Sequence, residues 1–121
     1  MRNHGLVKPF VAGAIVPPYR IVKFGADDDT AIAAAAAADK SIGVTDMLGA
    51  SAVGVTFDIV LTGIAEVEYG GPVTRGDDLT ADAQGRAVAV AAAGNRVIGK
   101  AMATGVLGDI GSVLIDRGVA A

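Results

Sequence analysis

The chain has 121 residues, enough for one domain that folds around its own core. Its formal net charge of −3 argues against nucleic acid as a partner, and the absence of cysteine excludes disulfides and thiolate chemistry. No apolar run reaches the ~20 residues of a membrane-spanning helix, so no membrane partner is expected.

Alanine dominates the apolar content, because apolar residues make up 52% of the chain while aromatic residues make up 4%. Charged residues, at 19%, leave little charge for the surface. We therefore expect part of the uncharged surface to be buried in an assembly. The alternative is that the source genome simply favours alanine codons.

The first 18 residues are predicted to form an extended arm that ends at Pro17-Pro18, since proline fixes φ and lacks a backbone donor. No hairpin partner is evident, so we expect the arm to order only against a partner. The alternative is that this stretch is the first strand of a barrel. The candidate residues for contact with a capsid or a second protomer are Leu6, Val7, Phe10, Val11, Ile15, Val16, Tyr19 and Arg20.

Residues 19–121 are predicted to form one mainly β domain, a small barrel or sandwich with at most a short helix. The clearest strand covers residues 53–61, with Phe57 and Ile59 on one face and Asp58 on the other. A turn at Thr62-Gly63 predicts that residues 64–69 return as its antiparallel partner. Further strands are predicted at residues 19–24, 87–91, 97–102 and 112–115.

Two further segments lie between these strands. Residues 79–87 are predicted to form a hairpin in which Gly85 adopts a positive φ. Residues 30–40 suit a short alanine helix capped by Asp29 or Thr30, but an isolated helix of that length is marginal. We expect a strand there, followed by a turn at residues 38–40.

The sequence lacks the residue sets of an enzyme. The single histidine, His4, lies near the terminus and supplies neither a catalytic triad nor a histidine metal site. Asp27-Asp28-Asp29 lacks the spacing of a calcium loop, so a solvated turn is expected. No glycine-rich phosphate motif precedes a helix. We predict no catalytic activity, no cofactor and no metal.

Seven short stretches occur in a distinctive order along the chain. They are PYRIVKFG at 18–25, IGVTD at 42–46, GIAEVEYGG at 63–71, VTRGDDLT at 73–80, DAQGRA at 82–87, and IG at 98–99 followed by GDIG at 108–111. In this order they resemble the capsid cement or head decoration proteins of tailed bacteriophages. The motifs are turns and strands, so it is their order that carries the resemblance.

The resemblance implies a β-rich domain that binds the outside of an icosahedral shell and stabilises it, without an active site. The implied partners are the major capsid protein and further copies of the chain, as a homotrimer that bridges capsid subunits. The implied location is the exterior of the virion, after synthesis in the cytoplasm of the bacterial host.

Three alternatives stay open at this stage. The run ADKS at residues 38–41 is similar to the hairpin tip of lipoyl carrier domains, which are small β-barrels, so Lys40 could carry a modification. A secreted structural or adhesin module is the second alternative. A bacterial compartment protein that assembles into sheets is the third.

Overall fold

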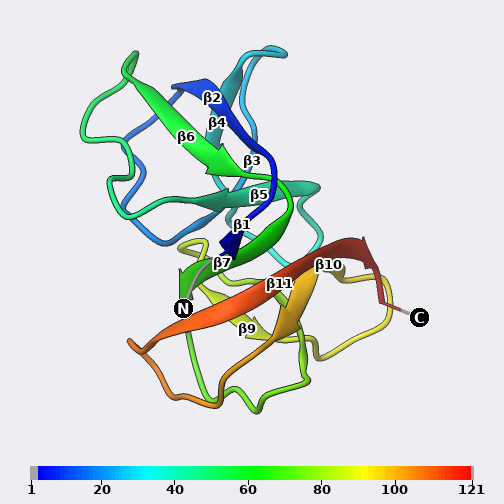
Figure 1. Ribbon diagram of the computed structural model, residues 1–121. Helices are drawn as coiled ribbons and strands as arrows, with labels where there is room; N and C mark the ends of the chain where they lie inside the picture. The colour runs from blue at the N-terminus through cyan, green and yellow to red at the C-terminus, as the bar shows by residue number, and fades with distance from the viewer. Residues whose placement is uncertain (1–2, 121) are drawn as a thin grey trace.

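The computed structural model describes residues 3–120. All regular secondary structure in that range is β-strand. The strands form a closed barrel in the order β2-β4-β3-β5-β6 and a 6-stranded sheet in the order β1-β7-β11-β10-β8-β9 (Figure 1). This confirms the predicted mainly β domain with a small barrel. Among residues 3–120, no helix is long and apolar enough to cross a bilayer.

The barrel strands are β2 (Val7–Ala12), β3 (Ile21–Phe24), β4 (Thr30–Ala33), β5 (Ser41–Thr45) and β6 (Thr56–Val60). The sheet strands are β1 (Asn3–His4), β7 (Gly63–Glu68), β8 (Asp78–Ala81), β9 (Ala87–Ala89), β10 (Arg96–Ala101) and β11 (Ile110–Val119).

Strand β2 belongs to the barrel, so the prediction of an unpaired arm is wrong for residues 7–12. The strand pairs antiparallel with β6 from Val7 to Val11 and parallel with β4 at its end. Phe10 and Ala12 point into the barrel core, while Val7 and Val11 point outward. The pairing partners lie about fifty residues away in β6 and about twenty away in β4, so they are not the sequence neighbours that a hairpin would pair.

Strands β6 and β7 do not pair with each other, which corrects the predicted antiparallel pair. Strand β6 lies in the barrel between β2 and β5, and β7 lies in the sheet between β1 and β11. The predicted faces are correct, because Phe57, Ile59 and Val67 are buried and Asp58 is exposed. Alternation fixes which side of a strand is buried but not which strand lies beside it.

The alanine-rich segment forms β4 and then a turn, as expected. The Asp39 carboxylate closes this turn by accepting hydrogen bonds from the amides of Ala35 and Ala36 at 2.8 and 3.1 Å. Its Oδ2 also lies 2.9 Å from Lys23 Nζ. Gly85 has φ of +76°, which confirms its predicted role in the turn between β8 and β9.

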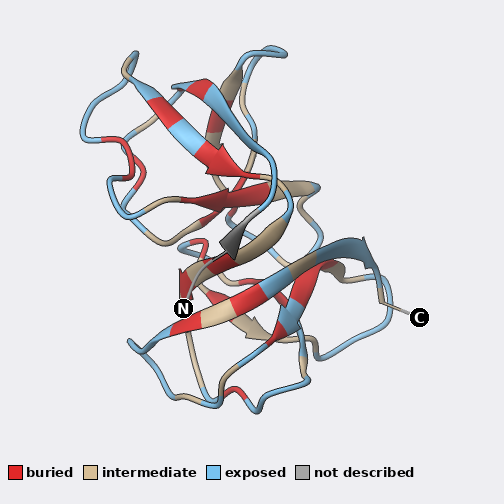
Figure 2. Ribbon diagram, viewed as in Figure 1, coloured by how far each residue is buried: buried red, intermediate tan, exposed pale blue. Residues whose placement is uncertain are grey.

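The barrel and the sheet share one hydrophobic core. One cluster joins Ile21, Val44 and Val60 of the barrel to buried sheet residues such as Leu79 and Ile98. A second cluster, around Phe10, Val22, Phe57 and Ile59, lies within the barrel itself. In Figure 2, buried positions continue from the barrel strands into the sheet. The two sets of strands are therefore packed together rather than connected only by a linker.

Candidate binding surfaces

The structure separates the predicted contact residues into distinct environments. Phe10 and Val16 are buried in the barrel core, which leaves their side chains no surface for a partner. Leu6, Val7, Val11 and Ile15 are exposed on the outside of the barrel. Tyr19 and Arg20 are half-buried where the barrel meets the sheet.

Tyr19 and Arg20 connect β3 of the barrel to β7 of the sheet. Tyr19 has φ of +62°, and its carbonyl accepts a hydrogen bond from the Glu68 amide at 2.9 Å. A non-glycine residue with positive φ is uncommon and is held there by its surroundings. Arg20 Nη1 lies 2.9 Å from Glu68 Oε1, while Nε and Nη1 make no aligned hydrogen bond within the described residues. Both residues therefore form part of the contact between the barrel and the sheet.

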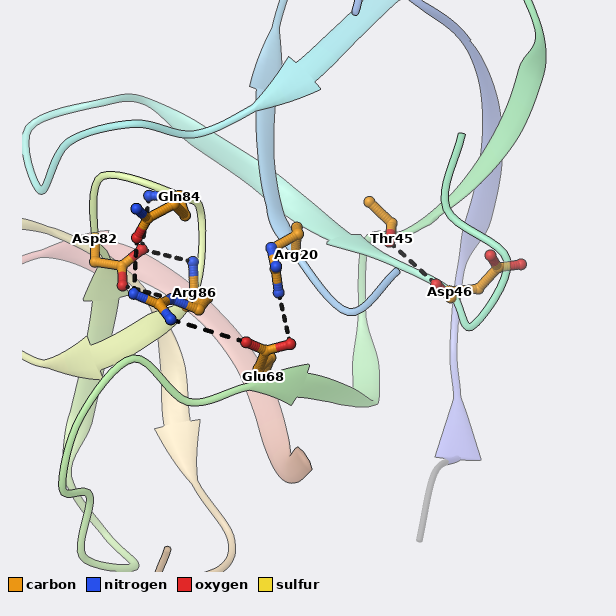
Figure 3. A network of polar contacts seen from close by, with 7 residues as sticks. All are labelled: Arg20, Thr45, Asp46, Glu68, Asp82, Gln84 and Arg86. Atoms are coloured by element: carbon orange, nitrogen blue, oxygen red, sulfur yellow. Dashed lines mark hydrogen bonds and ion pairs between the residues drawn. The ribbon is translucent and has the colours of Figure 1, made fainter. Parts of the chain in front are cut away.

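A charge-balanced network extends this contact between barrel and sheet toward the turn between β8 and β9 (Figure 3). Glu68 lies between two guanidinium groups, because its Oε2 is 4.0 Å from Arg86 Nη1. Arg86 Nε donates to Asp82 Oδ2 at 3.0 Å, and Arg86 Nη2 donates to Gln84 Oε1 at 2.7 Å. Partly exposed ion pairs of this kind contribute little stability each. Their effect is to orient the turn against the barrel.

Large aliphatic side chains gather on two loops at one end of the barrel. We call residues 13–19 and 46–55 the barrel loop pair. The loops are bonded to each other, since the amide and carbonyl of Val16 pair with those of Ala50 at 2.9 and 2.8 Å. Ile15, Leu48 and Val53 are 66%, 78% and 68% exposed, and Met47 is also exposed. This arrangement presents apolar side chains from a fixed backbone.

A second apolar loop region lies at the other end of the molecule, in the lower part of Figure 1. Residues 102–109 are bonded to residues 70–77, because Val73 and Gly105 exchange two backbone hydrogen bonds of 2.9 Å. Met102, Val106 and Leu107 are exposed there. Beneath them, the Tyr69 hydroxyl donates to the Ala103 carbonyl at 2.7 Å. Burial, and then the charge of Asp109, raise the pKa of Tyr69.

The sequence identified only part of the first loop region, through the contact candidates Ile15, Val16 and Tyr19, and nothing of the second. Leu48, Val106 and Leu107 lie in glycine-containing segments without strand or helix periodicity, so no strand or helix pattern distinguishes them. The available signal was the presence of large aliphatic side chains inside turn segments, since loops normally lie at the surface.

The acidic turn at residues 27–29 has the geometry of an ordinary solvated turn. Asp27 Oδ1 accepts hydrogen bonds from Thr30 Oγ1 at 2.7 Å and the Asp29 amide at 3.1 Å. These bonds, the one from Thr30 first, lower the pKa of Asp27. Within residues 3–120, no three histidine, aspartate or glutamate side chains are grouped so that they could hold a metal ion.

Comparison with known proteins identifies a shared fold. No family model and no curated protein matches the chain. Among solved structures, the chain is similar to the N base of head fiber gp8.5 of bacteriophage phi29, with a TM-score of 0.67 and 20% sequence identity. The similarity covers 92% of this chain and 93% of the phi29 chain. It therefore extends over both the barrel and the sheet.

Proposed function

We propose that the chain is a non-enzymatic structural protein of a bacteriophage particle that binds the outside of the shell. The observation that carries the proposal is the fold it shares with the phi29 head fiber N base across 92% of its length. The order of the turn and strand motifs along the sequence, which resembles that of phage cement proteins, supports the same class of virion structural protein independently of that comparison.

The proposed partners are the major capsid protein and further copies of the chain. A protein that binds an assembled shell but not its dissociated parts stabilises the shell through mass action. Binding as a homotrimer engages several capsid subunits at once, which raises the overall affinity without new contacts per copy. The chain would be made in the host cytoplasm and remain on the exterior of the virion.

We assign the capsid contact to the barrel loop pair. Its exposed side chains Ile15, Met47, Leu48 and Val53 come from loops that are already bonded together. Fully burying one Leu or Val side chain is worth about 1.5–3 kcal/mol. Because the loops are fixed before binding, little of that energy is lost in ordering them.

The test is co-sedimentation of the purified protein with shells that lack it. Saturable, stoichiometric binding is expected for the unaltered chain. Crosslinking of the bound protein is expected to yield trimers. Leu48→Glu combined with Val53→Glu should abolish binding, since burying two unpaired charges is costly. Val106→Glu, an exposed position at the other end of the molecule, is the matched control and should bind normally.

Circular dichroism of each variant separates lost binding from lost folding. Failure of the unaltered protein to bind any such shell would overturn the proposed function. Normal binding by the Leu48 and Val53 variant would overturn only the assignment of the contact surface. An intact mass with an adduct on Lys40 would instead favour a carrier domain.

A further inference from the structure

We infer that the chain has an oxyanion-binding site where the turn before β5 meets the start of β10 and the end of β11. A concavity of about 310 Å³ lies between these segments, lined by Lys40, Ser41, Arg96 and Arg117 together with apolar residues of β10 and β11. Among residues 3–120, no aspartate or glutamate lines it. This inference does not depend on the proposed role in a phage particle.

Within residues 3–120, no carboxylate forms an ion pair with the positive side chains of the concavity. Asp39, next to Lys40, is 2.9 Å from Lys23 Nζ and is also bonded to two amides of its own turn. Lys40 and Arg96 form no ion pair with any residue in the described range 3–120.

Asp116, the acidic neighbour of Arg117 in the sequence, lies near Lys100, which is outside the concavity. Asp116 and Arg117 are consecutive in a strand, so their side chains point to opposite sides of the sheet. Lys100 Nζ lies 2.8 Å from Asp78, and both Asp78 and, more weakly, Asp116 raise the pKa of Lys100. Asp116 is therefore on the side of Lys100, away from the concavity.

The backbone and one side chain of the site are fixed in place. Arg117 Nη1 donates to the Ile42 carbonyl of β5, which ties the end of β11 to the barrel. The Arg96 amide donates to the Ala37 carbonyl at 2.7 Å, which holds the start of β10 beside the same turn. Like charges held close together repel one another, and an anion between them relieves that repulsion.

The ligand class follows from the donors. A guanidinium presents parallel N–H groups that match the two oxygens of a carboxylate or a phosphate. Lys40 adds a mobile ammonium, and the Ser41 hydroxyl adds a neutral donor. The chain has only 10 lysines and arginines and an overall charge of −3, so this site is a local reversal of its net charge. The ligand is therefore a small oxyanion or an acidic side chain of a protein.

The experiment is a pair of NMR titrations of the ¹⁵N-labelled full chain at constant ionic strength, because salt screens exposed charges. One titrant is inorganic phosphate, and the other is an acetylated Asp-Asp-Asp peptide. We expect saturable shifts confined to the amides of residues 40–41, 96–97 and 117–119. Arg96→Gln should weaken binding about tenfold, as expected for the loss of a charged hydrogen bond.

Arg75→Gln is the matched control, because it removes one positive charge from a loop outside the concavity. This variant should bind the titrant with the same affinity as the unaltered chain. Lys40→Gln alters an exposed side chain and provides a second variant if Arg96→Gln disturbs the spectrum. Binding of either titrant at this site supports the inference, and the tighter one identifies the source of the oxyanion. The inference would be overturned if neither titrant gave localised shifts. It would also be overturned if the Lys40 and Arg96 variants bound the titrant with the same affinity as the unaltered chain.

Discussion

Tyr69 makes two glycines necessary through close packing rather than through turn geometry. Its ring is fully buried, and a Cβ atom at Gly105 would lie 2.8 Å from two ring carbons. A Cβ atom at Gly111 would lie 2.7 Å from Cε2 and closer still to the hydroxyl. Gly111 lies within β11 rather than in a turn, and its lack of a side chain allows the ring to fit.

Gly111→Ala should therefore lower the free energy of unfolding by about 1–3 kcal/mol, the usual cost of overpacking a core. Gly118→Ala is the matched control in the same strand, because an added Cβ atom there would have no neighbour within 4 Å and its φ is ordinary. That control should change stability by no more than about 0.5 kcal/mol. Urea denaturation of both variants measures the difference, and equal stabilities would contradict the packing explanation.

The turn between β8 and β9 is the element that docks the sheet onto the barrel. The Gly85 carbonyl accepts a hydrogen bond from the Ile21 amide at 2.7 Å, and the Ile21 carbonyl accepts one from the Ala34 amide at 2.9 Å. A Cβ atom at Gly85 would lie 3.0 Å from the Ile21 carbonyl oxygen. The sequence predicted this hairpin and its positive φ, but not the surface against which the turn packs.

Gly85→Ala should destabilise the protein more than Gly94→Ala. Both glycines have positive φ, at +76° and +88°, so both substitutions strain the backbone by about 1 kcal/mol or more. Of the two, only Gly85 has neighbouring atoms within 4 Å of an added Cβ. The difference in thermal unfolding between the two variants therefore measures the docking contact. Equal losses would show that the turn does not press against the barrel.

At the scale of the whole molecule, the shared core predicts that barrel and sheet unfold together. Ile21 of β3 belongs to the cluster that spans both, whereas its neighbour Val22 belongs to the cluster inside the barrel. Both side chains are fully buried. A molecule with one cooperative core loses stability everywhere when either side is truncated.

Ile21→Ala should cost about 2–5 kcal/mol, and Val22→Ala somewhat less. Hydrogen exchange should show the same loss of protection at amides of β7 and β10 as at amides of the barrel, in both variants. If Val22→Ala lowered protection in the barrel alone, the two sets of strands would be separate cooperative units.

Much of the local structure could be predicted from the sequence. Alternation in residues 53–69 identified the buried faces, and the alanine-rich segment was correctly expected to be a strand and a turn. These features depend on side-chain size, polarity and φ preference over a few residues, which are properties of the sequence itself. Exposed contact residues were predicted less well, since Phe10 and Val16 are buried.

The sequence by itself determined that this is a small β protein with inward and outward faces on its main strands. Only the tertiary structure decided that β2 closes a barrel, that β6 and β7 belong to different sheets, and that Lys40, Arg96 and Arg117 surround one concavity. The physical reason is that strand pairing and charge convergence depend on residues tens of positions apart. A period of two residues contains no information about those partners.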